Sequence, residues 1–335
     1  MHSHHSHSGD YSAHGTDPLD SVVDQVVNLN FHTYCLTEHI PRIEAKFIYP
    51  EEQSLGKNPE EVITKLETSF KNFMSHAQEI KTRYADRPDV RTKFIIGMEI
   101  ESCDMAHIEY AKRLMKENND ILKFCVGSVH HVNGIPIDFD QQQWYNSLHS
   151  FNDNLKDFLL SYFQSQYEML INIKPLVVGH FDLYKLFLPN DMLVNQKSGN
   201  CNEETGVPVA SLDVISEWPE IYDAVVRNLQ FIDSYGGAIE INTSALRKGL
   251  EEPYPSKTLC NLVKKHCGSR FVLSDDAHGV AQVGVCYDKV KKYIVDVLQL
   301  EYICYLEESQ SPENLLTVKR LPISQFVNDP FWANI

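Results

Sequence analysis

The sequence lacks several features that would assign it to familiar protein classes. No two of its eight cysteines form a C-x-x-C pair, and several of them stand in apolar runs. In a chain of 335 residues this pattern indicates buried, reduced thiols in an intracellular protein rather than a disulfide framework. No apolar stretch has the length needed to cross a membrane, and no leader-like apolar segment precedes the first histidines. We therefore expect a cytoplasmic protein with no membrane partner.

The sequence also lacks an excess of basic residues. Its 30 Lys and Arg against 46 Asp and Glu give a formal net charge of −16. Nucleic-acid backbones are bound mainly by Lys and Arg, so no nucleic-acid partner is expected. The hydrophobic content of 43% is enough for a sizeable core, which argues against disorder.

Short apolar runs alternate with longer amphipathic stretches along the chain. The runs are rich in Ile, Val, Phe and Leu, as strands buried on both faces are. They occupy residues 33–39, 93–101, 123–131, 176–183, 237–244, 270–278 and 301–307. Helices are expected after Pro18 and near 59–85, 104–119, 141–173, 211–235, 256–267 and 286–299. This alternation predicts a parallel α/β barrel in one domain, residues 1–335, with long loops at 40–58 and 189–210.

Histidines and carboxylates stand at the ends of these predicted strands. They are His39 in LTEH, Glu99 in GMEIE, His130 in VGSVH, His180 in VVGH, and Asp276 and His278 in SDDAH. The carboxyl ends of parallel strands meet at one rim of a barrel, where such folds carry their sites. Imidazole and carboxylate without thiolate favour zinc, iron or manganese over a cysteine-type structural zinc.

Other histidines are interpreted differently. We expect surface or helix-face positions for His32, His76, His107, His149 and His266. His131 directly follows His130, so its side chain should point the opposite way.

The amino-terminal segment MHSHHSHSGDYSAHGTD holds five histidines in its first fourteen residues. An engineered metal-affinity tag would have no matching ligands downstream, whereas this segment has them. Two H-x-H pairs are available, His2 with His4 and His5 with His7. Residues two apart in a strand point to the same side, so either pair could bind one ion.

The order of these motifs resembles the PHP family, whose name stands for polymerase and histidinol phosphatase. The segments HSHSGDYSAHGT, LTEHIPR, GMEIE, GSVHH, GHFDL, EINTSALRKG and SDDAHG are most similar to its histidinol-phosphate phosphatases of fungal type. The resemblance runs from the first residues to about residue 285. It implies a distorted (β/α)7 barrel of TIM-like type, with the metal site at the carboxyl ends of the strands.

The resemblance also implies two or three divalent metal ions, which could be zinc, iron or manganese. The spacing to SGDYSAHG favours His5 and His7 as the H-x-H pair. The first ion would be held by His5, His7, Glu99 and Asp276. The second would share Glu99 and add His130 and His180, and the third would be held by His14, His39 and His278.

These residues suit the hydrolysis of a phosphate monoester. Two cations about 3.5–4 Å apart acidify a bridging water to a hydroxide nucleophile and bind the phosphate oxygens. We expect Glu99 to bridge the cations and Asp276 to accept the proton of the nucleophile, with His278 completing the catalytic set. Arg247, in NTSALRKG, and Arg42, after His39, are the candidates for binding the phosphate.

The leading prediction is therefore a histidinol-phosphate phosphatase of histidine biosynthesis, a phosphoric monoester hydrolase. One alternative is a PHP phosphoesterase that acts on nucleotides or oligonucleotide 3′ ends. Another is a metal-binding protein without catalytic activity.

Overall fold

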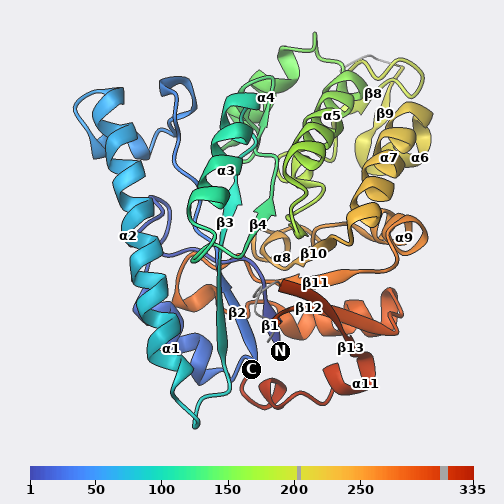
Figure 1. Cartoon of the computed structure of the whole chain (residues 1–335). Helices are drawn as coiled ribbons and strands as arrows, with labels where there is room; N and C mark the ends of the chain where they lie inside the picture. Colours follow the sequence, from blue (N-terminus) through green and yellow to red (C-terminus); the bar gives the residue numbers. More distant parts are fainter. Residues whose placement is uncertain (202–204, 310–315) are drawn as a thin grey trace.

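A mostly parallel central sheet, flanked by helices, organises the chain (Figure 1). The computed structural model describes residues 1–201, 205–309 and 316–335. The sheet has nine strands in the order β1-β2-β3-β4-β7-β10-β11-β12-β13. Neighbouring strands pair in parallel from β1 to β12, and β13 pairs antiparallel with β12. Their bounds are β1 His2–Ser3, β2 Thr33–Leu36, β3 Lys93–Ile100, β4 Phe124–Gly127, β7 Val177–Val178, β10 Ala238–Asn242, β11 Phe271–Ser274, β12 Tyr302–Glu308 and β13 Leu316–Pro322.

Seven of these strands, β2, β3, β4, β7, β10, β11 and β12, lie in the seven runs expected from the sequence. The expected seven-stranded barrel is not confirmed, because within the described residues the sheet has nine strands and is not closed by strand pairing. Hydrogen bonds nevertheless join the segment that follows β1 both to β11 and to the residues that come directly after β11. The amide of His4 donates to the carbonyl of Leu273 at 3.1 Å, and the amide of Asp276 donates to that of His5 at 3.2 Å.

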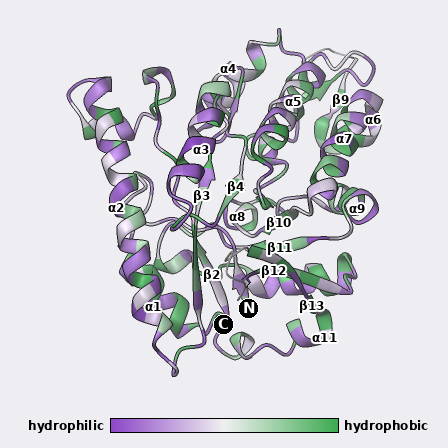
Figure 2. Cartoon of the chain, viewed as in Figure 1, coloured by the Kyte–Doolittle hydropathy of each residue, from purple (hydrophilic) through white to green (hydrophobic). Residues whose placement is uncertain are grey.

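The helices cover the sheet and bury their apolar stripes against it. Their bounds are α1 Leu19–Asn28, α2 Pro59–Ala85, α3 Met105–Glu117, α4 Gln141–His149, α5 Leu155–Ile173, α6 Val214–Glu217, α7 Pro219–Tyr235, α8 Ser244–Arg247, α9 Lys257–His266, α10 Tyr287–Lys292 and α11 Ile323–Phe326. A π-helical turn, Tyr293–Val297, follows α10. Figure 2 shows α2 alternating between hydrophobic and hydrophilic residues, whereas β11 is hydrophobic.

Helix α2 shows how the local sequence specifies its element. The side chain of Asn58 accepts a hydrogen bond from the amide of Glu61 at 2.9 Å, and Pro59 occupies the first turn. The helix expected near 59–85 is confirmed, and apolar residues three or four apart, such as Phe70, Phe73 and Ala77, are buried on one of its faces.

Two predicted helices are each divided in the structure. The stretch 141–173 forms α4 and α5, because Asn152 and Asp153 adopt positive φ angles of 54° and 57°. The side chain of Asn154 then caps α5. The stretch 211–235 forms a short α6 and a longer α7 that begins at Pro219.

The two predicted long loops contain short elements. The first, 40–58, contains 3-10 turns at Ala45–Phe47 and Glu52–Leu55. The second, 189–210, contains the antiparallel pair β8 Leu193–Val194 and β9 Val207–Pro208, and its residues 202–204 lie outside the described residues. A further pair, β5 His131–Val132 and β6 Ile135–Pro136, follows β4.

The cysteines agree with the prediction of reduced thiols. All eight are free, and seven of them are buried, the exception being the half-buried Cys286. Among the described helices, none combines the length and apolarity required to cross a membrane.

Candidate active site

The predicted histidines and carboxylates meet at the carboxyl ends of the parallel strands. Glu99 lies near the end of β3, and the loops that follow β2, β4, β7 and β11 carry the others. The latter are His39, His130, His180, Asp276 and His278. His5 and His7 follow β1, where the amide of His7 donates to the carbonyl of Ala277 at 2.7 Å. Backbone hydrogen bonds therefore fix the amino-terminal histidines beside the Asp276–His278 segment.

Glu99 is at the centre of the group, with a side chain only 1% exposed. Its Oε1 atom lies 3.0 Å from Nε2 of His130 and 3.1 Å from Nε2 of His180. Both histidines thus face the same carboxylate oxygen.

The other oxygen of Glu99 faces a different set of histidines. Its Oε2 atom lies 3.2 Å from Nε2 of His5, 3.4 Å from Nε2 of His7 and 2.8 Å from Nδ1 of His39. Each oxygen of this one carboxylate therefore meets its own group of imidazoles, which is the geometry required of a bridging ligand.

Asp276 completes the set that faces His5 and His7. Its Oδ1 atom is 3.5 Å from Nε2 of His7 and 3.8 Å from Nε2 of His5. The opposite oxygen, Oδ2, accepts hydrogen bonds from the hydroxyl of Ser244 at 3.1 Å and the side-chain amide of Asn242 at 3.3 Å. These two bonds leave Oδ1 directed toward the histidines.

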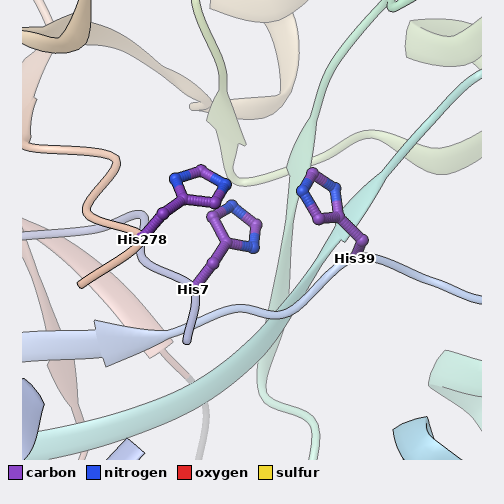
Figure 3. Close-up of side chains that lie close together, drawn as sticks. All are labelled: His7, His39 and His278. Atoms are coloured by element: carbon purple, nitrogen blue, oxygen red, sulfur yellow. The ribbon is translucent and has the colours of Figure 1, made fainter. Parts of the chain in front are cut away.

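A third group consists of His7, His39 and His278, whose ring nitrogens lie within 4.8 Å of one another. Figure 3 shows the three rings directed toward a common point. The ring of His7 is 4.0 Å from that of His39 and 4.3 Å from that of His278, centroid to centroid.

His14 is placed at the edge of this third group. Its ring centroid is 4.5 Å from that of His278 and 5.4 Å from that of His39. The side chain is 46% exposed, and its Nδ1 atom lies 3.3 Å from a carboxylate oxygen of Glu51.

The two H-x-H pairs occupy different positions in the fold. His2 stacks on Tyr305 at 4.3 Å. His4 hydrogen-bonds to the carbonyl of Leu273 through Nδ1 and accepts the amide of Leu306 through Nε2. Of these four histidines, His5 and His7 face Glu99, as the sequence favoured.

Oxygen atoms orient several of the imidazoles. Nδ1 of His5 donates to Glu240 at 3.0 Å, Nδ1 of His130 donates to Asp138 at 2.8 Å, and Nδ1 of His278 donates to the carbonyl of Asp276 at 3.0 Å. Such bonds fix the tautomer and leave Nε2 of each ring as a free ligand atom. Glu240 and Asp138 were missed in the sequence. The sequence did contain a signal for Glu240, because it stands inside the apolar run AIEIN, and a buried carboxylate requires a partner.

The group also contains buried nitrogen and oxygen atoms without hydrogen-bond partners. They include Nε2 of His5, both ring nitrogens of His7, Nε2 of His278 and Oε2 of Glu99. Unpartnered buried polar atoms are rare because they cost free energy. A cluster of them on histidine and carboxylate side chains fits divalent cations with nitrogen and oxygen ligands, such as zinc, iron or manganese.

The electrostatics of the group agree with this fit. Burial acts to raise the pKa of Glu99, but His5, His130 and His39 outweigh it and hold that pKa well below its usual range. The carboxylate is therefore ionised and available to bind positive charge.

A cavity of about 470 Å³ opens above these residues, within the roughly 300–1,000 Å³ range of small-molecule sites. Arg247, from the short helix α8, lines it, and its Nη2 atom donates to the carbonyl of Asp276 at 3.3 Å. Its Nε atom is buried without a partner.

Arg42 lines the same cavity, but its guanidinium is already paired with carboxylates. It is 2% exposed, and its Nη1 atom lies 3.0 Å from Glu101 and donates to the carbonyl of Ile40 at 2.9 Å. Glu52 lies 3.6 Å from Nη2. Arg42 is thus already paired with carboxylates, whereas Arg247 meets a backbone carbonyl.

The remaining histidines follow the sequence interpretation with one exception. His131 points away from the site and lies against Phe47 and Tyr49. His107 is on a helix, as expected, but is fully buried, with hydrogen bonds to Asp104 and to the amide of Ile43.

Comparison with known proteins identifies the family of this site. The PHP domain model matches residues 3–244. The chain is 99% identical over 335 residues to the histidinol-phosphatase of Saccharomyces cerevisiae, covering 100% of both chains. It is 34% identical over 306 residues to a candidate histidinol-phosphatase of Schizosaccharomyces pombe, covering 91% of this chain and 89% of that protein.

Two solved structures share the fold. A candidate histidinol phosphatase from Listeria monocytogenes superposes with a TM-score of 0.65 at 20% identity, covering 86% of this chain and 99% of the other. The histidinol phosphate phosphatase of Lactococcus lactis, solved with zinc, L-histidinol and phosphate, gives a TM-score of 0.54 at 15% identity, covering 87% and 92%. With its motifs, its rim of histidines and the match over residues 3–244, the chain belongs to the PHP domain family and groups there with the fungal histidinol-phosphatases.

Proposed function

We propose that this chain is a histidinol-phosphate phosphatase, which hydrolyses L-histidinol phosphate to L-histidinol and inorganic phosphate. The observation that carries the proposal is the division of the Glu99 carboxylate between two groups of histidines beneath a cavity lined by Arg247. The 99% identity to the yeast histidinol-phosphatase supports the choice of substrate. Zinc, L-histidinol and phosphate, bound in the Lactococcus lactis protein, suit a site of this composition.

Two or three divalent cations are the cofactors in this proposal. His5, His7, Glu99 and Asp276 would hold the first, and Glu99, His130 and His180 the second. His14, His39 and His278 would hold the third. The ring nitrogens of His39 and His278 do lie within 4.8 Å of each other, which supports this pair, but the third member of that close group is His7 rather than His14. Cations bound here would supply Lewis acidity to the phosphate oxygens and would lower the pKa of water.

The side chains around the cations have separate roles in the proposal. Arg247 binds the phosphate through its planar guanidinium, which suits a phosphate oxygen pair better than Lys does. Asp276 would hold the first cation and is also the candidate acceptor of the proton of the attacking water, and hydrogen bonds from Ser244 and Asn242 fix the orientation of its carboxylate through Oδ2. Glu99 would be shared by two cations, because each of its oxygens faces a different group of histidines.

The fold provides the frame for these roles. We infer that the hydrogen bonds between the segment after β1 and β11 draw the open sheet into a distorted, barrel-like curve in one domain. This curvature would bring both ends of the parallel part of the sheet to one site.

Phosphate release by the purified, metal-loaded chain tests the proposal. Zinc, manganese and ferrous iron are loaded separately after removal of bound metals, and L-histidinol phosphate is compared with nucleoside monophosphates and a 3′-phosphorylated oligonucleotide. We expect L-histidinol phosphate to be hydrolysed with the highest kcat/KM. We also expect Glu99→Gln to lower that value by at least about 100-fold, since an amide has one ligand oxygen instead of two. A higher kcat/KM for a nucleotide, or turnover that Glu99→Gln leaves intact, would contradict the proposal.

A further inference from the structure

One wall of the active-site cavity is aromatic. Among the described residues that line the cavity, the aromatic rings other than histidine are those of Tyr49 and Phe139. The two rings stack with centroids 5.9 Å apart and an interplanar angle of 29°. Tyr49 is buried against the guanidinium of Arg42, which lies 4.8 Å from its ring centroid, and its hydroxyl donates to Glu101 at 3.4 Å. Tyr49 is therefore fixed, and the half-buried Phe139 is the ring that a ligand meets.

The same wall carries a carboxylate, Asp138, that forms no ion pair with a Lys or Arg among the described residues, although the charge of Lys248, which also lines the cavity, acts on it. Oδ2 of Asp138 accepts the hydrogen bond from His130, and Oδ1 is buried without a hydrogen-bond partner. Within the described residues, the ion pair of Asp138 is with His130, and no Lys or Arg nitrogen lies within 4.0 Å of its carboxylate. The side chain is 16% exposed.

The other carboxylates of the cavity are already engaged. Glu99 and Asp276 face the histidine groups, and Glu101 is paired with Arg42 at 3.0 Å. Glu51 lies 3.3 Å from His14. Asp138 is therefore the lining carboxylate best placed to attract a cationic group of a ligand.

These features match the alcohol half of the proposed substrate. L-histidinol phosphate carries an ammonium and an imidazole beyond its phosphate ester. We propose that Asp138 binds the ammonium and that Phe139, supported by Tyr49, packs against the imidazole. This inference rests on the proposed function and adds the residues that select its substrate. Asp138 and Phe139 are consecutive, between β6 and α4, so one short segment presents both the charge and the ring. The loop 40–58 contributes through Tyr49.

Three substrates separate the two contacts in steady-state assays. They are L-histidinol phosphate, its analogue without the amine, and its analogue with an alkyl group in place of the imidazole. Asp138→Asn should lower kcat/KM for L-histidinol phosphate by about 10- to 100-fold, the value of a hydrogen bond to a charged group. The analogue without the amine should keep a kcat/KM close to that of the unsubstituted chain.

Phe139→Leu should give the complementary pattern. It should lower kcat/KM by about 2- to 10-fold for both substrates that carry the imidazole, which is the range for aromatic pairs. The alkyl analogue should be little affected, because its side chain packs on leucine as well as on phenylalanine.

Asp140→Asn is the matched control for Asp138→Asn. Asp140 lies two residues further along and caps α4, where its side chain accepts the amide of Gln143 at 2.7 Å. Asparagine caps a helix equally well, so this variant changes the same charge without changing the cavity wall. It should leave all three kcat/KM values unchanged.

A measurement of metal content distinguishes two roles of Asp138, namely binding the substrate and orienting His130. The side-chain amide introduced by Asp138→Asn can still accept the His130 hydrogen bond through its oxygen, so we expect this variant to retain the metal content of the unsubstituted chain. Lower metal content with an equal loss for all three substrates would overturn the proposal, since Asp138 would then act only on His130. Loss of amine selectivity in Glu51→Gln instead of Asp138→Asn would also overturn it. If the unsubstituted chain itself fails to hydrolyse L-histidinol phosphate, the proposed function fails rather than this assignment alone.

Discussion

His5 and Glu240 form a buried pair in which Nδ1 of the imidazole donates to Oε1 of the carboxylate at 3.0 Å. Both side chains are completely buried. The second oxygen of Glu240 accepts the amide of His180 at 2.8 Å. One carboxylate in the middle of β10 therefore orients two candidate ligands, which are far apart in the sequence but have ring centroids 5.8 Å apart.

This pair makes Glu240 a testable positioning residue. In Glu240→Gln the single amide oxygen can accept only one of the two hydrogen bonds, so one histidine loses its orientation. We expect metal affinity to fall by about 10- to 100-fold, as for comparable partners of metal-binding histidines. Titration of the metal-free variant with zinc, followed by phosphate release at saturating zinc, measures both effects. Unchanged zinc affinity would remove Glu240 from this role.

Arg247→Ala should weaken phosphate binding without unfolding the chain. Loss of a charge-assisted hydrogen bond to the substrate should reduce kcat/KM by about 10- to 100-fold. Inhibition by inorganic phosphate should weaken in parallel, and Arg247→Lys should recover part of both. If the variant binds inorganic phosphate as well as the unsubstituted chain, Arg247 does not contact the phosphate.

Arg42→Met should affect stability instead. The substitution removes the arginine partner of the buried Glu101, which within the described residues keeps only His39 and the hydroxyl of Tyr49, and should cost up to about 3–5 kcal/mol of the free energy of unfolding. Urea denaturation measures this change. An elevated KM with an unchanged denaturation midpoint would show that Arg42 binds the phosphate, as the sequence suggested.

Cations should stabilise the folded chain as well as activate it. A ligand that binds only the folded state at about 100 times its Kd adds about 2.7 kcal/mol to the free energy of unfolding. Thermal unfolding of the metal-free chain should therefore shift upward on addition of zinc or manganese, and the shift should be smaller in Glu99→Gln. Equal shifts in the two proteins would indicate that the cations bind elsewhere.

The stability of the chain should also depend on pH through His4. Burial lowers the pKa of His4 to about 4, against the opposing hydrogen bond to Leu273 and the charge of Glu240. Because the unfolded chain binds the proton more readily, this contribution is fully present above about pH 6.5 and is lost as the pH falls toward 4. Between these two pH limits, the change in the free energy of unfolding that is due to His4 is about 3 kcal/mol.

His4→Gln tests this dependence because its amide can keep both hydrogen bonds without titrating. The difference in unfolding free energy between pH 7 and pH 5 should be smaller in the variant. The same pH dependence in both proteins would assign the effect to other groups.

Much of the site could be predicted because each ligand stands at a recognisable local position. His39, His130 and His180 each close an apolar run, and the parallel fold then brings the ends of those runs together. The seven predicted strands were found for the same reason, since a run of apolar residues is a local signal.

Other features depend on contacts between distant residues, and the sequence alone did not reveal them. The pairing of Arg42 with Glu101 is an example, because Glu101 lies just after β3, far from Arg42 in the sequence, and meets it only in the fold. Strand β13 is half-buried to exposed and mixes polar with apolar residues, so its sequence carries no clear strand signal. It becomes a strand by pairing with β12. The break between α4 and α5 depends on two residues with positive φ inside an otherwise helical pattern.

The proximity of the first histidines to Asp276 has a consequence for biosynthesis. The hydroxyl of Ser274 reaches the carbonyl of His5 across 269 positions of the chain. On a translating ribosome the segment with His5 and His7 emerges early, but its partners on β11 are made much later. Until β11 has been made, the nascent chain holds these imidazoles without Asp276, so the complete ligand group can assemble only after that strand has been synthesised.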